Sequence, residues 1–212
     1  MIEVRSVHAT GHDGRGFGNA IGMADLTRGT RKQVCRHIAD KLGRRTIVMI
    51  GLMGAGKTTI GRRLAARLDL PFVDADAEIE RAAGKSIEDI FNDHGEAEFR
   101  DGERRVIARL LEAGPQVLAT GGGAFMDLQT RDAIARAGIS VWLRASHKVL
   151  TDRVARRDHR PLLKTGNAGA IMRALMDERY PFYRKADITV ESRDVAHEII
   201  VNDVVGKIAG LL

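Results

Sequence analysis

Residues Gly51–Thr58 fit the pattern G-x-x-x-x-G-K-[ST], in which the backbone N–H groups of a glycine-rich loop surround the phosphates of a nucleotide. The lysine of such a loop, here Lys57, bridges the outer phosphates, and the hydroxyl of Thr58 is offered to Mg²⁺. A simple glycine-rich turn before a helix is the alternative interpretation. The motif predicts contacts to a nucleoside triphosphate from Gly54, Ala55, Gly56, Lys57, Thr58 and Thr59.

Two aspartates, Asp74 and Asp76, follow the next predicted strand with one residue between them. Because ligands gather at the carboxyl ends of the strands in doubly wound sheets, both carboxylates are expected at the site. Alternating residues of an extended segment also point the same way. One carboxylate would anchor the water shell of a metal, and the other would accept a proton from a hydroxyl. Capping of the next helix is the alternative role for either aspartate.

A run of three glycines and two arginines provides a third set of candidates. Gly121–Gly123 follow a predicted strand, and glycines in series let the backbone approach a ligand and present N–H groups to it. A tight turn that needs positive φ is the alternative. Arg100 and Arg179 carry guanidinium groups, which bind carboxylates bidentately. Either arginine alone would more often be a solvated surface charge.

The elements around these residues are those that a nucleotide-binding α/β domain requires. Thr46–Ile50 is a short, apolar, β-branched run typical of a strand, and Ile60, Leu64 and Leu68 after the loop recur at helical spacing. Strand, glycine loop and helix together favour the phosphate-binding interpretation. Further strands are predicted at 71–74, 116–120, 140–143 and 188–190. Strands that alternate with helices predict a parallel sheet covered on both faces.

Several helix boundaries can also be predicted. Ser86 and Asp89 resemble a capping box that opens a helix at Ile87–Asp93, and Gly95 separates it from a longer helix that ends at Gly114. A helix is predicted at Leu128–Ala137. The closing helix is predicted to bury Ile199, Ile200, Val204, Ile208 and Leu212.

Composition restricts the class of protein. The 212 residues suit one domain, and the net charge of +6 suggests an anionic partner, with clustered arginines favouring small anions. Cys35 is the only cysteine, which predicts a reducing compartment. No apolar run approaches a membrane span, and we expect a cytoplasmic protein.

The amino-terminal residues form the least patterned part of the sequence. Residues 1–30 are predicted to be a flexible extension, and a working start at Met23 or a later residue would explain the lack of pattern. The glycines of Gly14–Gly18 lack the preceding strand and following helix of a dinucleotide site. From Arg31 to Leu42 the apolar spacing predicts a basic helix that Gly43 ends, so a single folded domain would span residues 31–212.

Taken together, these motifs closely resemble those of shikimate kinases, in order and spacing, over about residues 45–212. The resemblance implies a P-loop NTPase-type fold of the nucleoside monophosphate kinase-like kind, with a five-stranded parallel sheet and a mobile lid over about residues 153–169. It also implies a monomeric, cytoplasmic enzyme of aromatic amino-acid biosynthesis that uses ATP and Mg²⁺ to phosphorylate the 3-hydroxyl of shikimate. The matching segments are Gly51–Thr58, Phe72–Asp76, Glu96–Arg100, Gly121–Gly123, Arg160–Leu163 and Arg179–Tyr183.

The same resemblance assigns residues to roles. On the acceptor side Asp76 would bind the accepting hydroxyl, Arg100 and Arg179 would hold the shikimate carboxylate, and Gly122 and Gly123 would line the pocket. On the nucleotide side Arg160 of the lid would reach the transferring phosphate, Arg153 would pack against adenine, and Asp74 would support Mg²⁺ through water. Arg193 is a candidate adenine contact, although the segment Glu191–Asp194 lacks the proline often found there.

Three other functions are compatible with parts of the sequence. Another small P-loop metabolite kinase, such as a gluconate kinase, would share the loop, but the paired aspartates and two arginines argue against it. A non-catalytic relative would bind nucleotide or shikimate tightly without turnover. A basic nucleic-acid-binding protein would show salt-dependent affinity, but no recognition helix or stacking surface is evident in the sequence.

Overall fold

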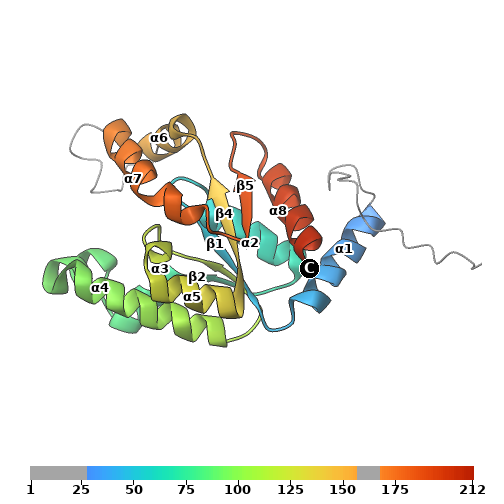
Figure 1. The fold of residues 1–212 in the computed structure, drawn as a ribbon, viewed down its shortest axis with the longest axis horizontal. Helices are drawn as coiled ribbons and strands as arrows, with labels where there is room; N and C mark the ends of the chain where they lie inside the picture. The colour runs from blue at the N-terminus through green and yellow to red at the C-terminus, as the bar shows by residue number, and fades with distance from the viewer. Residues whose placement is uncertain (1–27, 157–167) are drawn as a thin grey trace, which may run out of the picture.

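The computed structural model describes residues 28–156 and 168–212, and within them five parallel strands form one sheet (Figure 1). The strand order is β2-β3-β1-β4-β5, and every neighbouring pair is parallel. This confirms the predicted fold class. The strands are β1 (Thr46–Ile50), β2 (Phe72–Asp74), β3 (Val117–Ala119), β4 (Gly138–Arg144) and β5 (Ile188–Glu191).

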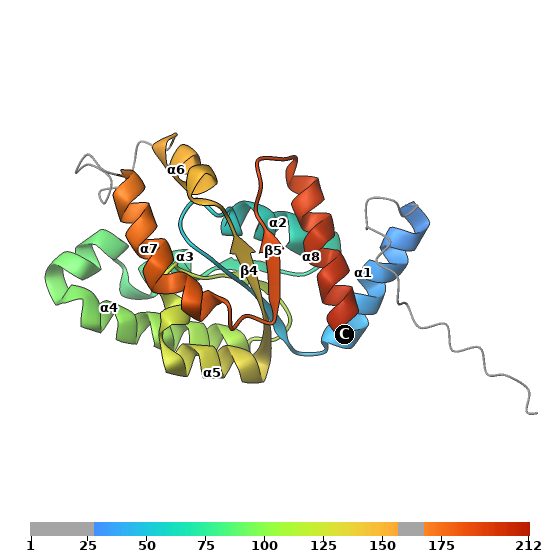
Figure 2. The ribbon, with the colours of Figure 1, turned by 45° about the horizontal axis from the view of Figure 1, so that its top comes forward.

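Helices cover both faces of the sheet, as buried parallel strands require. Helices α1, α2 and α8 pack together on one face, and α4, α5 and α7 lie on the other (Figures 1 and 2). All five residues of β1, at the centre of the sheet, are buried. The helices are α1 (Arg28–Leu42), α2 (Lys57–Leu68), α3 (Ala75–Ala83), α4 (Ile87–Glu112), α5 (Leu128–Ala137), α6 (His147–Ala155), α7 (Ala168–Tyr183) and α8 (His197–Leu211), with the short 3-10 helix η1 (Ala124–Met126).

Helix α1 joins the core through its apolar face. Ile38 and Leu42 are almost fully buried, and the helix packs on α2 and α8. Gly43 follows with φ of 60°, the left-handed conformation predicted for its cap. The helix begins at Arg28, three residues before the predicted start. The predicted flexible extension lies mostly outside the described residues.

Helix α4 has the interruption that its sequence predicts. The Ser86 side chain accepts a hydrogen bond from the Asp89 backbone N–H at 3.1 Å, which caps the first turn. Gly95, with φ of 78° and ψ of 177°, breaks the helical backbone and separates a first segment from a longer second one. Arg100 therefore stands in the first turns of a separately oriented helix that leads to β3.

Helix α7 contains Pro181 and ends at Tyr183. The burial pattern of α8 differs from prediction. The prediction that Ile199 is buried is wrong, because its side chain is 42% exposed. Neighbouring residues of a helix point about 100° apart, and α8 turns to the core Ile200, as predicted, and Val201.

None of the helices in residues 28–156 and 168–212 combines the length and the apolar character that crossing a bilayer requires.

Candidate active site

The loop between β1 and α2 has the backbone shape that its glycines allow. Gly51, Gly54 and Gly56 have φ of 141°, 80° and 94°, conformations that residues with a Cβ rarely adopt. A Cβ on Gly51 would also lie 2.8 Å from the carbonyl oxygen of Leu143 in β4. The loop then enters α2, whose free N–H groups and dipole favour an anion.

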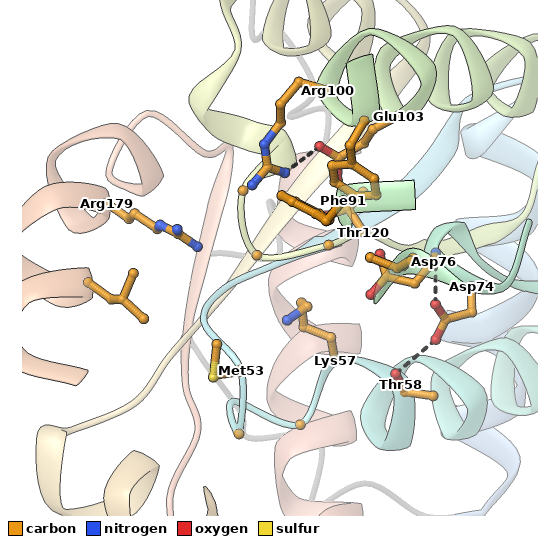
Figure 3. A pocket seen from close by; sticks show the side chains of 18 of the residues that line it. Met53, Lys57, Thr58, Asp74, Asp76, Phe91, Arg100, Glu103, Thr120 and Arg179 are labelled. Atoms are coloured by element: carbon orange, nitrogen blue, oxygen red, sulfur yellow. Dashed lines mark hydrogen bonds and ion pairs between the residues drawn. The ribbon is translucent and has the colours of Figure 1, made fainter. Parts of the chain in front are cut away.

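Lys57 and Thr58 begin α2 at the mouth of this loop. The Lys57 amine donates to the carbonyl oxygens of Gly51 at 2.8 Å and Leu52 at 3.2 Å, so it lies folded over the loop. The Thr58 hydroxyl donates to Asp74 Oδ2 at 3.0 Å, which connects the loop to the end of β2 (Figure 3). A cation that needs oxygen ligands would meet a hydroxyl and a carboxylate here.

Asp74 and Asp76 both line the cavity at the carboxyl end of β2, as predicted, but they do not alternate along one extended segment. Helix α3 begins at Ala75, so the two residues do not lie on one extended segment. Asp74 is the N-cap of α3, and its Oδ1 accepts from the Asp76 backbone N–H at 3.2 Å. The capping role that was considered as an alternative is therefore real, and Asp74 combines it with the bond from Thr58.

The triple glycine allows close packing of charged side chains. The left-handed conformation that a tight turn would need is not adopted by Gly121, Gly122 or Gly123. A Cβ on Gly121 would lie 2.7 Å from Glu103 Oε1 and 2.8 Å from Asp76 Oδ1. A Cβ on Gly123 would lie 2.5–2.6 Å from the Arg100 guanidinium. A side chain at Gly121 or Gly123 would therefore have to displace one of these three charged groups.

Arg100 is held in place by acidic neighbours on its own helix. Its Nη1 donates to Glu103 Oε2 at 2.7 Å, and its Nη2 to Glu96 Oε1 at 3.3 Å. Burial would lower the pKa of the Arg100 guanidinium, but these ion pairs raise it, so the group stays charged. Glu103 is 2% exposed, and burial raises the pKa of its carboxyl although Arg100 opposes the shift.

Arg179 reaches the cavity from α7 on another side of the triple glycine (Figure 3). Its side chain is mostly buried, and its Nε donates no hydrogen bond to the residues that the structure describes, with Glu178 Oε2 3.8 Å away. Tyr183 lies nearby, and its hydroxyl donates to the Gly122 carbonyl. Burial raises the pKa of the Tyr183 phenol, so it stays a neutral donor. The mostly buried side chain thus brings the Arg179 guanidinium to the wall of the cavity.

These residues share one cavity of about 350 Å³. It runs from the phosphate loop to the two arginines, and Phe91 and Phe99, whose ring centroids are 4.5 Å apart, form an apolar wall. Most of the predicted site residues border this cavity. They are Gly54, Gly56, Lys57, Thr58, Thr59, Asp74, Asp76, Arg100, Gly122, Gly123 and Arg179. Ala55, also in the loop, is buried and does not border this cavity.

A second cavity, of about 420 Å³, lies on the other side of the phosphate loop. Arg153 from α6 and Arg193 after β5 both line it, together with Gly54, Gly56 and Thr59 of the loop. The two arginines predicted on the nucleotide side are therefore together, and apart from the acceptor arginines. Arg160 and most of the predicted lid lie outside the described residues.

Two polar residues at these cavities were not predicted to have a role. Glu103 follows Arg100 by three residues, the spacing of facing residues on a helix, and it shares the buried stripe with Phe99 and Ile107. That spacing was a usable signal. Ser192 is buried beside the loop, and a serine after a strand carries no comparable signal.

A phosphate loop at one end of a cavity and two fixed guanidinium groups at the other define a P-loop kinase that acts on a small anionic acceptor. The family described as shikimate kinase matches residues 53–209 of the chain. The chain is 58% identical over 166 residues to the shikimate kinase of Bradyrhizobium diazoefficiens, covering 78% of this chain and 80% of that protein. The chain belongs to the shikimate kinase family, and it is an ATP-dependent kinase.

Solved structures agree with this family. The chain resembles a shikimate kinase from Acinetobacter baumannii in complex with shikimate, with 38% identity, a TM-score of 0.72, and 82% of this chain and 96% of that one covered. A gluconokinase from Sinorhizobium meliloti shares the fold, with a TM-score of 0.52 at 19% identity over 79% of this chain and 93% of that one. The fold alone thus does not separate shikimate kinases from other small P-loop kinases.

Proposed function

We propose that the cavity transfers the γ-phosphate of ATP to the 3-hydroxyl of shikimate, which gives shikimate 3-phosphate and ADP for aromatic amino-acid biosynthesis. The observation that carries this proposal is the shared cavity of about 350 Å³, with Lys57 at one end and Arg100 and Arg179 at the other. A carboxylate on the acceptor would pair with the arginines, and its hydroxyl would face the phosphate loop.

On the acceptor side, Arg100 and Arg179 would bind the shikimate carboxylate, since guanidinium groups match carboxylates in geometry. Gly122 and Gly123 would line the same pocket, because the missing side chains leave room beside both guanidinium groups. Asp76 would accept a hydrogen bond from the 3-hydroxyl. The ion pair with Glu103 supports this proposal, since it holds Arg100 in one orientation before substrate arrives.

The reaction would proceed by in-line attack. The 3-hydroxyl oxygen forms a bond to the γ-phosphorus, the bond from that phosphorus to the β–γ bridging oxygen breaks, and the hydroxyl proton goes to Asp76. Lys57 would stabilise charge on the transferring group, since phosphoryl transfer needs mainly positioning and electrostatic stabilisation. Arg160 would reach the same phosphate from the lid over about residues 153–169, an assignment that rests on the family resemblance alone.

Mg²⁺ would be held by Thr58 and, through water, by Asp74. Their oxygen atoms, 3.0 Å apart, suit this hard cation. Within residues 28–156 and 168–212, no three His, Cys, Asp or Glu side chains gather as a metal cage. That arrangement fits an ion that keeps most of its waters and binds nucleotide phosphates. When bound, Mg²⁺ would neutralise negative charge on the phosphates.

The nucleoside would occupy the cavity between Arg153 and the loop after β5. Arg153 would pack against adenine, and Arg193, which borders the same cavity, is a second candidate contact. Thr59 and the loop residues 54–58 would contact the phosphates of ATP. That both arginines line the cavity is observed, and we propose that they contact the adenine base.

A coupled assay for ADP release tests the proposal. With ATP, Mg²⁺ and shikimate we expect turnover that stops when shikimate, ATP or Mg²⁺ is omitted, and gluconate should not replace shikimate. Phosphorylation at the 3-position is read from the product by NMR. Turnover with gluconate but not shikimate would contradict the assignment. Tight binding of shikimate without ADP release would identify a sensor, and salt-dependent nucleic-acid binding without turnover a nucleic-acid-binding protein.

We also propose that residues 31–212 form a single cytoplasmic, monomeric kinase domain, with residues 1–30 as a flexible extension. The burial of Ile38 and Leu42 supports including the first helix in the domain. Because that helix begins at Arg28, a variant that starts at residue 28 is the sharper test. It should keep full activity and sediment as a monomer, whereas lost activity would assign a role to the extension.

A further inference from the structure

Ser192 is a buried residue that connects three segments on the nucleotide side of the protein. It follows β5 and is 4% exposed. Its backbone N–H donates to the Arg144 carbonyl at 2.6 Å, at the end of β4. Its hydroxyl donates to the Ala55 carbonyl at 2.8 Å and accepts a hydrogen bond from Arg153 Nη1 at 2.8 Å. The hydroxyl therefore links the phosphate loop directly to an arginine of α6.

The Arg153 guanidinium is held by uncharged oxygens from two loops. Its Nη1 also donates to the Gly54 carbonyl at 3.3 Å, and its Nη2 donates to the Arg193 carbonyl at 2.6 Å. Two of these three acceptors belong to the backbone, and the third is Ser192 Oγ. Ser192 is thus the one acceptor in this set that a substitution can remove.

The geometry of the hydroxyl explains why one serine can serve both partners. A hydroxyl has one hydrogen and two lone pairs, so donation to Ala55 leaves an acceptor for Arg153. The bond to Ala55 is buried and the bond from Arg153 is partly buried, and an unpaired polar group in such a place is costly. The orientation of the guanidinium is therefore tied to the position of the phosphate loop, and both border the cavity of about 420 Å³.

We propose that Ser192 is a positioning residue for the nucleotide: it holds Arg153 in the orientation that receives the nucleoside and locks that orientation to the phosphate loop through Ala55. This inference rests on the proposed place of the nucleoside beside Arg153. Without the hydroxyl, the long arginine side chain gains rotamers that it must lose again when ATP binds. Ser192 acts on ATP affinity through Arg153 and leaves the shikimate end unchanged.

A double-mutant cycle on Ser192 and Arg153 tests the inference. Ser192→Ala should raise the KM for ATP about 3- to 12-fold, the effect of one net hydrogen bond, and change the KM for shikimate less than about twofold. In an Arg153→Ala background the same change should alter the KM for ATP less than about twofold, because the group through which it acts is gone. Ser192→Thr, which keeps the hydroxyl, should restore most of the affinity.

A second buried serine provides the matched control. Ser140 is 3% exposed, and its hydroxyl donates to Asp187 at 2.6 Å near the start of β4, away from the loop. Ser140→Ala should lower Tm and leave the KM for ATP unchanged. Equal effects of Ser192→Ala in both backgrounds, or equal rises in both KM values, would overturn the inference.

The outcome also separates this inference from the proposed function. If Arg153→Ala alone leaves the KM for ATP unchanged, the place of the nucleoside is wrong. If Arg153→Ala raises the KM for ATP and Ser192→Ala raises it by the same factor in both backgrounds, only the proposed role of Ser192 is wrong. Should Ser192→Ala not fold, Ser192→Cys keeps the volume with a weak donor, and the same cycle on that variant distinguishes the same two results.

Discussion

The two ends of the 350 Å³ cavity are built from different materials. The phosphate end is mostly backbone, with Gly54 and Gly56 at positive φ and the start of α2. The acceptor end consists of charged side chains from α4 and α7, with Arg100 already paired to Glu103 at 2.7 Å. A substitution cannot remove a backbone N–H group from the phosphate end. At the acceptor end, by contrast, a substitution can remove one charged side chain and leave the others in place. Substitutions at the two ends should therefore change different kinetic constants.

Lys57→Ala should cause the largest effect, because it removes the side-chain cation of the phosphate end. We expect kcat to fall at least about 100-fold, the cost of losing a preorganised charge partner in the transition state. The loop keeps other internal bonds, such as Ala55 N–H to the Leu52 carbonyl at 3.1 Å, so the fold should survive. Lys148→Ala, at an exposed lysine of α6, is the control, and near-normal turnover of Lys57→Ala would contradict the assignment.

Arg179→Ala should lower kcat/KM for shikimate about 10- to 100-fold, the value of a charge-assisted hydrogen bond. The KM for ATP should stay within about twofold, since Arg179 borders the acceptor end. Arg173→Ala, at an exposed position of the same helix, is the matched control and should leave both constants unchanged. Unchanged shikimate kinetics in Arg179→Ala, or an equal loss for both substrates, would remove the distinction between the two ends.

Gly123→Ala should give a smaller effect of the same kind. The added methyl group would lie 2.5–2.6 Å from the Arg100 guanidinium, which must turn away. A strained or displaced rotamer of this arginine should raise the KM for shikimate about 2- to 10-fold and spare the KM for ATP. Gly102→Ala, where a Cβ meets no atom within 4 Å, should leave both KM values alone. A larger effect of Gly102→Ala than of Gly123→Ala would contradict this account.

The same difference in construction explains what the sequence could predict. The phosphate end is contiguous, so Gly51–Thr58 and its flanking strand and helix identified it directly. The acceptor end draws on residues 76 to 179, and the sequence pointed to Arg100 and Arg179 mainly through family spacing. Glu103 was missed because a glutamate in a helix usually faces solvent, and only its place on the stripe of Phe99 and Ile107 indicated burial.

Other errors have local physical causes. Asp74 and Asp76 were expected on one extended segment, but β2 ends at Asp74, which caps α3, so Asp76 already belongs to the helix. Ile199 and Ile200 are both apolar, and only packing of α8 on α2 decides which one is buried. Contacts such as Arg153 to the Gly54 carbonyl join residues 99 positions apart, and no local pattern encodes them. Such contacts depend on how the helices and loops between the strands pack against one another in the folded protein.

Glu103→Gln should have the smallest effect of these substitutions. It tests whether the buried carboxylate that pairs with Arg100 lowers the free energy of unfolding. Burial raises the pKa of the Glu103 carboxyl in the folded state, against the opposing charge of Arg100. The folded state therefore holds the proton more tightly than the unfolded state. Its contribution to the free energy of unfolding is full below the ordinary pKa of about 4.3 and is lost as pH rises through the raised value.

Urea unfolding of wild type and Glu103→Gln between about pH 4 and pH 8 measures this contribution. The free energy of unfolding of the wild type relative to the variant should fall as pH rises through the raised pKa of Glu103, and then stay level. Glu112→Gln, at an exposed position of the same helix, shows how much a carboxylate-to-amide change does away from the cavity. If the difference instead grew with pH, Arg100 would outweigh burial, and the acceptor end would gain stability from its ion pair.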